Sequence, residues 1–100
     1  MSDSKIIIFN VLTINLNSQS NYLYFMNSAI VLINSKLGSE KELIDNIKNL
    51  PSVTDVYEVY GVYDIVVKVE AKSSEELKTT CSRTIRNMKN VRATLTMIII

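Results

Sequence analysis

The sequence predicts one α+β domain in which a four-stranded antiparallel sheet carries two helices on one face. Three observations lead to this fold class. Short β-branched apolar runs alternate with two segments of helical periodicity, in the order β-α-β-β-α-β. One glycine separates the two middle strands, as is typical of a hairpin. The chain has 100 residues, 47% of them hydrophobic, which suits a single core.

The first strand is predicted at residues 28–35, SAIVLINS, because this apolar run is short and is bounded by polar residues. Residues 39–51, SEKELIDNIKNLP, then have a helical period. Ser39 and Glu42 have the spacing of a capping box, and Pro51 ends the helix. The apolar stripe of this helix consists of Leu43, Ile44, Ile47 and Leu50.

Two strands rich in β-branched and aromatic residues follow at 53–60 and 63–70, and Gly61 between them predicts an antiparallel hairpin. The second helix lies within 73–90. Ser73 and Glu76 repeat the capping box, and the apolar stripe consists of Leu77, Cys81, Ile85 and Met88. Residues 91–100, VRATLTMIII, form the closing strand.

With right-handed crossovers, this order gives the ferredoxin-like arrangement. Both faces of the sheet are predicted to be apolar. One face carries Val31, Ile33, Val67, Val69, Leu95 and Met97, and the other carries Ile30, Leu32, Val66, Ile98 and Ile100. Two helices cover only one face, so we expect a second copy to cover the other, sheet to sheet, in a homodimer.

Residues 1–27 are predicted to be an N-terminal extension of uncertain structure, and residues 28–100 to be the functional domain. The extension is an upstream appendage, a loosely attached strand or an artefact of the start site, and we favour the appendage. Its apolar stretch, KIIIFNVLTINL at 5–16, contains polar residues and is shorter than the ~20 residues that span a bilayer. It also lacks the pattern of a secretory signal, so neither a membrane location nor secretion is expected.

Composition excludes several function classes. The net charge of +1 gives no field that favours nucleic acid or an anionic membrane. The chain has no histidine, which removes the commonest general acid–base group and metal ligand. Cys81 is its one cysteine, so no disulfide forms within the chain and a reducing cytoplasm fits. No catalytic residue, metal or cofactor is expected, and we predict a protein that is not an enzyme.

Residues 28–100 resemble the stand-alone effector-binding (RAM) domain of the Lrp/AsnC class of transcription regulators. The resemblance covers NLPSV, DVYEVYG, GVYDIVVKVE, RTIRNMKNVRAT and TLTMIII. Its most specific element is the Gly-x-Tyr-Asp pattern of Gly61, Tyr63 and Asp64. The resemblance implies dimerisation through the sheet, assembly into higher rings, and an amino acid or similar effector bound where dimers meet.

One departure from the family concerns DNA. Full-length regulators place a helix-turn-helix before this domain, and the segment ahead of Ser28 is too short and wrongly patterned to be one. We therefore expect no sequence-specific DNA binding by this chain itself. The expected partners are a second copy, a small effector and full-length Lrp/AsnC regulators.

The predicted ligand site centres on the glycine of the hairpin. Gly61 permits a positive φ and close approach of a ligand, so exposed N–H groups there can hold an α-carboxylate while Asp64 faces an α-ammonium group. The alternative is that Gly61 only turns the hairpin and Asp64 caps it. The predicted ligand-binding residues are Tyr60, Gly61, Tyr63, Asp64, Thr94 and Thr96.

Other interpretations of these residues remain open. Thr94 and Thr96 share one strand face, where their hydroxyls complete a polar pocket or serve only as good strand formers. The hairpin tyrosines more often pack in a core or interface. Two further functions are a ligand-independent assembly partner of full-length regulators and a dimeric α/β-barrel enzyme, although no catalytic residues can be named for the enzyme.

Overall fold

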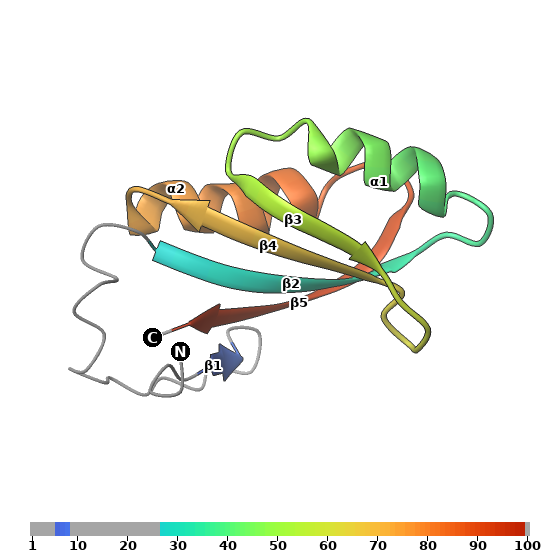
Figure 1. Ribbon diagram of the computed structural model, residues 1–100, viewed down its shortest axis with the longest axis horizontal. Helices are drawn as coiled ribbons and strands as arrows, with labels where there is room; N and C mark the ends of the chain where they lie inside the picture. The colour runs from blue at the N-terminus through green and yellow to red at the C-terminus, as the bar shows by residue number, and fades with distance from the viewer. Residues whose placement is uncertain (1–5, 9–26, 100) are drawn as a thin grey trace.

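The computed structural model describes residues 6–8 and 27–99, which form one antiparallel sheet with a helical layer (Figure 1). The strands are β1 (Ile6–Ile8), β2 (Asn27–Ser35), β3 (Val53–Glu58), β4 (Ile65–Ala71) and β5 (Val91–Ile99), in the spatial order β1-β5-β2-β4-β3. The helical segments are α1 (Glu40–Lys48), α2 (Ser74–Thr79) and the π-helical η3 (Thr80–Ile85), which continues α2. From β2 to β5 the order is β-α-β-β-α-β, which confirms the predicted ferredoxin-like fold.

The fifth strand, β1, comes from the N-terminal extension. It pairs antiparallel with the end of β5, where Ile6 lies opposite Ile99 and Ile8 lies opposite Met97. This pairing covers the outer edge of β5. The predicted start of the apolar stretch therefore contributes an edge strand, while the rest of residues 1–26 and Ile100 lie outside the described residues.

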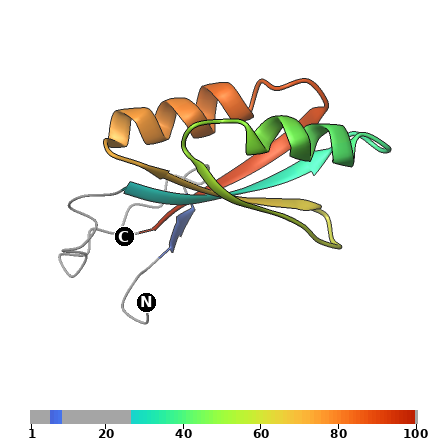
Figure 2. The ribbon, with the colours of Figure 1, turned by 45° about the horizontal axis from the view of Figure 1, so that its top comes forward.

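The helix α1 and the continuous helix of α2 and η3 lie on the same face of the sheet, as Figure 2 shows from the side. Leu43 and Ile47 of α1 are fully buried, and so are the apolar residues of the second helix that face the sheet. The buried apolar core consists of Ala29, Val31, Ile33, Leu43, Ile47, Ile65, Val67, Val69, Ala71, Leu77, Cys81 and Ile85. The predicted helical stripes are confirmed, since each supplies members of this core.

The predicted capping boxes differ from the observed helix starts. At α1 the Ser39 hydroxyl donates to the Lys36 carbonyl at 2.6 Å and does not cap the helix. Its backbone, at φ −110° and ψ 9°, is outside the extended region that a capping side chain needs. At α2 the extended Ser73 accepts from the Glu76 N–H at 3.0 Å, which is half of the predicted box. The Glu76 carboxylate accepts instead from the Ser52 hydroxyl, at 2.7 Å.

The register of β5 corrects the predicted sheet faces. Leu95 lies opposite Leu32 and Met97 lies opposite Ile30, so both share the face that the helices leave open. Ile98 lies opposite the buried Ala29, on the helix side. The prediction was wrong for β5 because both its odd-numbered and its even-numbered residues include apolar side chains. Only the pairing with β2 shows which set faces the helices.

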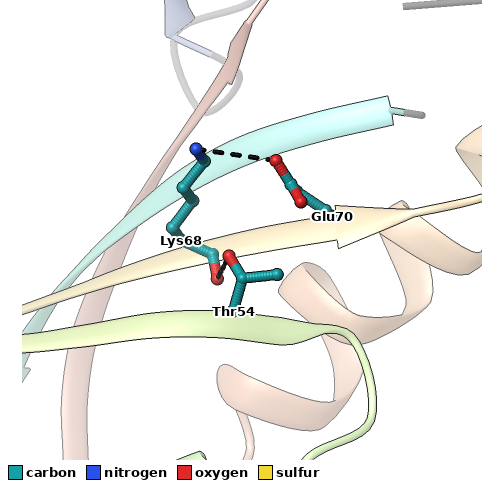
Figure 3. A network of polar contacts seen from close by, with 3 residues as sticks. All are labelled: Thr54, Lys68 and Glu70. Carbon is teal, nitrogen blue, oxygen red and sulfur yellow. Dashed lines mark hydrogen bonds and ion pairs between the residues drawn. The ribbon is translucent and has the colours of Figure 1, made fainter.

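The open face has an apolar centre and a polar margin. Its central side chains are each half-buried, and they are Ile30, Leu32, Val66, Leu95 and Met97. Toward the end of β4 the Lys68 ammonium lies 3.5 Å from the Glu70 carboxylate (Figure 3). At the outer edge the Thr54 hydroxyl donates to the Lys68 carbonyl at 3.3 Å.

Candidate ligand-binding site

The candidate site lies at the end of the sheet where two connections meet. There β2 ends, α1 begins, and the chain passes from β3 to β4 (Figure 1). A pocket of about 390 Å³ opens at this end. It is lined by Glu40, Glu58, Val59, Tyr60 and Asp64.

The connection between β3 and β4 is a loop of residues 59–64, and the two strands are shorter at this end than the sequence predicts. The Val59 N–H donates to the Asp64 carbonyl at 2.9 Å and closes the loop. Gly61 has a φ of +147°, a backbone conformation that L residues with a side chain rarely adopt. A Cβ there would lie 3.6 Å from the Tyr63 carbonyl oxygen, an ordinary contact. The backbone conformation, and not lack of space, therefore requires glycine.

The tip of this loop presents unpaired backbone donors. Among the described residues, the N–H groups of Tyr60, Gly61, Val62 and Tyr63 have no hydrogen-bond acceptor. The Tyr60 side chain and the Val62 side chain are exposed as well. A row of free N–H groups in a glycine-containing turn is a typical binding site for an anionic oxygen, which accepts their hydrogen bonds.

Asp64 is held in a fixed orientation at the base of the loop. One carboxylate oxygen accepts from the Ser35 backbone N–H at 3.0 Å, and the other accepts from the Ser35 hydroxyl at 2.6 Å. The Asp64 N–H donates to the Ile33 carbonyl at 2.9 Å. The carboxylate is half-buried and also lines the pocket, so it is both anchored to β2 and accessible.

The structure brings together part of the predicted site. Tyr60 and Asp64 line the pocket, and Gly61 and Tyr63 belong to the same loop. Thr94 and Thr96 do share one face of β5, but they lie opposite Ile33 and Val31, on the side of the helices. They are absent from the pocket lining, and Thr96 is buried at 3% exposure. Their role in binding stays a prediction.

Sequence reasoning missed the acidic residues of the pocket. Glu40 is the first residue of α1, and Glu58 is the last residue of β3. The topology offered a signal for both, because in a β-α-β-β unit the start of the helix and the hairpin lie at the same end of the sheet. With Asp64 they give the pocket three carboxylates, and among the described residues no lysine or arginine lines it. The lining therefore favours a ligand that presents a cationic group.

The remaining chemistry of the described residues is sparse. Burial raises the pKa of the Cys81 thiol to about 11, so this side chain is a core residue and not a nucleophile. Across residues 6–8 and 27–99 there is no cluster of three or more metal-ligating side chains. Within the same ranges, no helix has the length and apolar content of a membrane span.

Comparison with known proteins identifies relatives of this domain. The family model of the Lrp/AsnC ligand-binding domain matches residues 28–100. A comparison with curated proteins finds no match. The chain is similar to solved FFRP-DM1, with 35% identity over 72% of this chain and 96% of that one, and a TM-score of 0.69. It is equally similar, at 35% identity, to the hypothetical protein PHS023 from Pyrococcus horikoshii, over 72% of this chain and 87% of that one, with a TM-score of 0.67.

A longer protein shares the fold. The transcriptional regulator NMB0573 from Neisseria meningitidis, solved in complex with L-Met, has 9% identity and a TM-score of 0.68. The match covers 91% of this chain and 60% of the regulator, and at this identity it shows the fold alone. The family model and the two smaller relatives carry the assignment: the chain belongs to the Lrp/AsnC family, and residues 28–100 form its ligand-binding domain.

Proposed function

We propose that this chain is a regulatory domain that binds a free amino acid or a similar small effector at the loop pocket. One observation carries the proposal. The free N–H groups of residues 60–63 lie directly before a carboxylate, Asp64, whose orientation is fixed by Ser35. Complementary groups for both ends of an α-amino acid thus occur within one short segment of a ligand-binding domain.

In the proposed pose the effector's α-carboxylate accepts hydrogen bonds from the loop N–H groups, and its α-ammonium group donates to Asp64. A carboxylate has about four acceptor positions, and Ser35 uses two of those on Asp64. The others are free for the ammonium group. Gly61 supports this pose because it has no side chain of its own beside the free N–H groups and its positive φ suits a close approach of the ligand to the backbone.

The size of the pocket and a structural relative support the ligand class. A volume of about 390 Å³ is near the lower end for small-molecule sites, which suits a molecule as small as an amino acid. The Neisseria meningitidis regulator of the same fold is solved with L-Met. The acidic lining also affects which amino acid binds. Its carboxylates repel a second carboxylate in the side chain of the effector, so acidic amino acids are disfavoured.

We further propose that the domain acts as a dimer that packs through the open face of the sheet. Leu32 and Leu95 lie opposite each other at the centre of that face, with Lys68 and Glu70 at its margin. An apolar centre with a polar margin is the usual anatomy of an interface. A twofold axis through the centre would bury these leucines against their copies.

The proposed role is binding and not catalysis. The strands β3 and β4 separate α1 from α2, so the described residues contain no pair of helices joined by the short turn of a helix-turn-helix. Regulation would therefore proceed through assembly with further copies or with full-length Lrp/AsnC regulators, and the effector would shift that assembly.

A thermal-shift screen against the twenty amino acids tests the proposed function. A ligand that binds only the native state raises the melting temperature. At a hundredfold excess over Kd it adds about 2.7 kcal/mol to the free energy of unfolding. We expect at least one amino acid to do so, and Asp64→Asn to reduce the shift at the same ligand concentration. A wild-type protein that none of the twenty stabilises would contradict effector binding.

One observation favours a second function, a ligand-independent assembly partner. Leu37, Tyr60 and Val62 are almost fully exposed at the same end of the sheet as the pocket. Exposed apolar side chains of this size in one region often mark a protein interface. If no amino acid binds, and Tyr60→Ser together with Val62→Ser reduces association beyond the dimer in light scattering, assembly is the function of this end.

A further inference from the structure

Two adjacent residues of β2, the strand beside β4 in the sheet, hold the loop of residues 59–64. The Asn34 side-chain N–H donates to the Val62 carbonyl at 2.5 Å, at the tip of the loop. Ser35 makes its two hydrogen bonds to Asp64 at the base. Both contacts join residues far apart in the sequence, and neither belongs to the strand pairing of β2 with β4.

The remaining support of the loop is small. Within it the Val59 N–H donates to the Asp64 carbonyl, and the Asp64 N–H donates to the Ile33 carbonyl. The tip side chains of Tyr60 and Val62 are exposed, so burial contributes little to its conformation. An unanchored loop of this kind populates many conformations, and each residue fixed costs roughly 1–2 kcal/mol of conformational entropy.

We propose that Asn34 and Ser35 are positioning residues, which fix the loop in its binding conformation before the effector arrives. This inference rests on the proposed function. Asn34 fixes the peptide that carries Val62, and thereby the direction of the neighbouring free N–H groups. Ser35 fixes the rotamer of Asp64. It thereby fixes the distance between the Asp64 carboxylate, which receives the effector's ammonium group, and the free N–H groups, which receive its carboxylate. A ligand then binds without ordering the loop, which improves affinity.

The experiment compares two variants with two matched controls. Ser35→Ala removes the hydroxyl bond to Asp64 and leaves the bond from the backbone N–H in place. Ser28→Ala is its control because Ser28 lies at the other end of β2 and is equally buried, at 6% exposure. Asn34→Ala removes the anchor of Val62, and Asn46→Ala is its control because Asn46 is exposed on α1. Ser35→Thr keeps a hydroxyl at position 35 and serves as the conservative variant.

The first readout needs no effector. In Ser35→Ala and Asn34→Ala we expect the amide protons of Val59 and Asp64 to exchange about tenfold faster, the loss expected when one hydrogen bond is removed. We expect backbone order parameters of residues 60–63 to fall toward those of a flexible chain, below about 0.6. The control variants should keep wild-type values, and Ser35→Thr should recover them. Unchanged exchange and order parameters in both loop variants would overturn the proposal, as would equal effects in the controls.

The second readout separates this inference from the proposed function. L-Methionine and L-lysine are titrated calorimetrically into each variant, as one uncharged and one cationic probe, after the twenty-amino-acid screen. We expect binding to weaken about tenfold in Ser35→Ala and Asn34→Ala and to be unchanged in the controls. If the loop loosens but no amino acid binds even the wild type, the proposed function fails while β2 still anchors the loop. If the wild type binds and the loop variants bind as tightly, the positioning role fails while effector binding stands.

Discussion

The Ser35 hydroxyl donates a 2.6 Å hydrogen bond to Asp64, across the gap between the end of β2 and the loop before β4. The Ser35 backbone N–H adds a second bond, at 3.0 Å, to the other carboxylate oxygen. Asp64 therefore has a structural role that its place beside Gly61 did not reveal. This role is compatible with ligand binding, because the carboxylate keeps acceptor positions that Ser35 does not occupy.

Asp64→Asn tests the proposed ammonium contact. The amide keeps the size of the carboxylate and one acceptor for Ser35, but it removes the negative charge. We expect amino-acid binding to weaken by ~1.5–3 kcal/mol, the usual contribution of a hydrogen bond to a charged group. That loss corresponds to about ten- to more than a hundredfold in Kd, measured by calorimetric titration with the amino acid that gives the largest thermal shift.

The matched control for this variant is Asp45→Asn, which removes one carboxylate from the exposed side of α1. It makes the same change in net charge without touching the loop. Equal affinities for wild type and Asp64→Asn would leave Asp64 with its anchoring role alone. Both variants should remain dimeric, because neither position belongs to the open face of the sheet.

The charge of the pocket predicts a preference among effectors. Glu40, Glu58 and Asp64 line it, and no basic side chain of residues 6–8 and 27–99 does. We expect L-lysine to bind more tightly than L-glutamate, with a difference of ~1 kcal/mol or about fivefold for each carboxylate near the side chain. Glu58→Gln should narrow this difference, and so should added salt. Tighter binding of L-glutamate to the wild type would show that its side chain lies away from these residues.

The open face of the sheet predicts a variant that dissociates the proposed dimer. Leu95 lies opposite Leu32 at the centre of that face. Leu95→Lys would place a charge there and remove two leucines from a twofold interface, a loss of at least ~3 kcal/mol. The dimer dissociation constant should rise at least about a hundredfold in analytical ultracentrifugation. Leu37→Lys is the control, since Leu37 is 95% exposed in the turn after β2 and should leave the dimer intact.

Much of the fold could be predicted because its elements have strong periodicity. The helical stripe of Leu43 and Ile47 has a 3.6-residue period, and both residues are buried in the core. The alternation of Ile65, Val67 and Val69 in β4 is equally clear. The phase of β5 was not predictable from its own residues, because Leu95 through Ile99 are apolar on both sides except for Thr96. Only the pairing with β2 resolves it.

The candidate site was predicted less completely than the fold. Gly61 and Asp64 are only three residues apart in the sequence, so a local pattern identified them. Glu40 and Glu58 reach the pocket from different elements, which requires the topology and not a motif. Asn34 and Ser35 end a strand where polar residues are ordinary, and nothing in their spacing indicates contacts 28 and 29 residues along the chain.

The N-terminal extension predicts a mild effect of truncation. A chain that begins at Met26 loses β1, which pairs with β5 only through residues 6–8 at the outer edge of the sheet. We expect folding and dimerisation to persist, with a loss of about 1 kcal/mol, or roughly 4–8 °C in melting temperature. Scanning calorimetry and light scattering measure both. A collapse of the melting transition would show that the extension belongs to the core.

The buried thiol of Cys81 predicts a pH dependence that is separate from the ligand site. Its pKa is raised from about 9 to about 11 by burial, so between these values the native state binds more protons than the unfolded state. Stability from this group is complete below pH 9 and falls as the pH rises toward 11. Urea unfolding of the wild type and of Cys81→Ala at pH 8 and pH 10 isolates the contribution of the thiol from that of every other group. We expect the stability advantage of the wild type to shrink at the higher pH, and an advantage that stays constant would show that the thiol ionises as readily in the folded protein as in the unfolded chain.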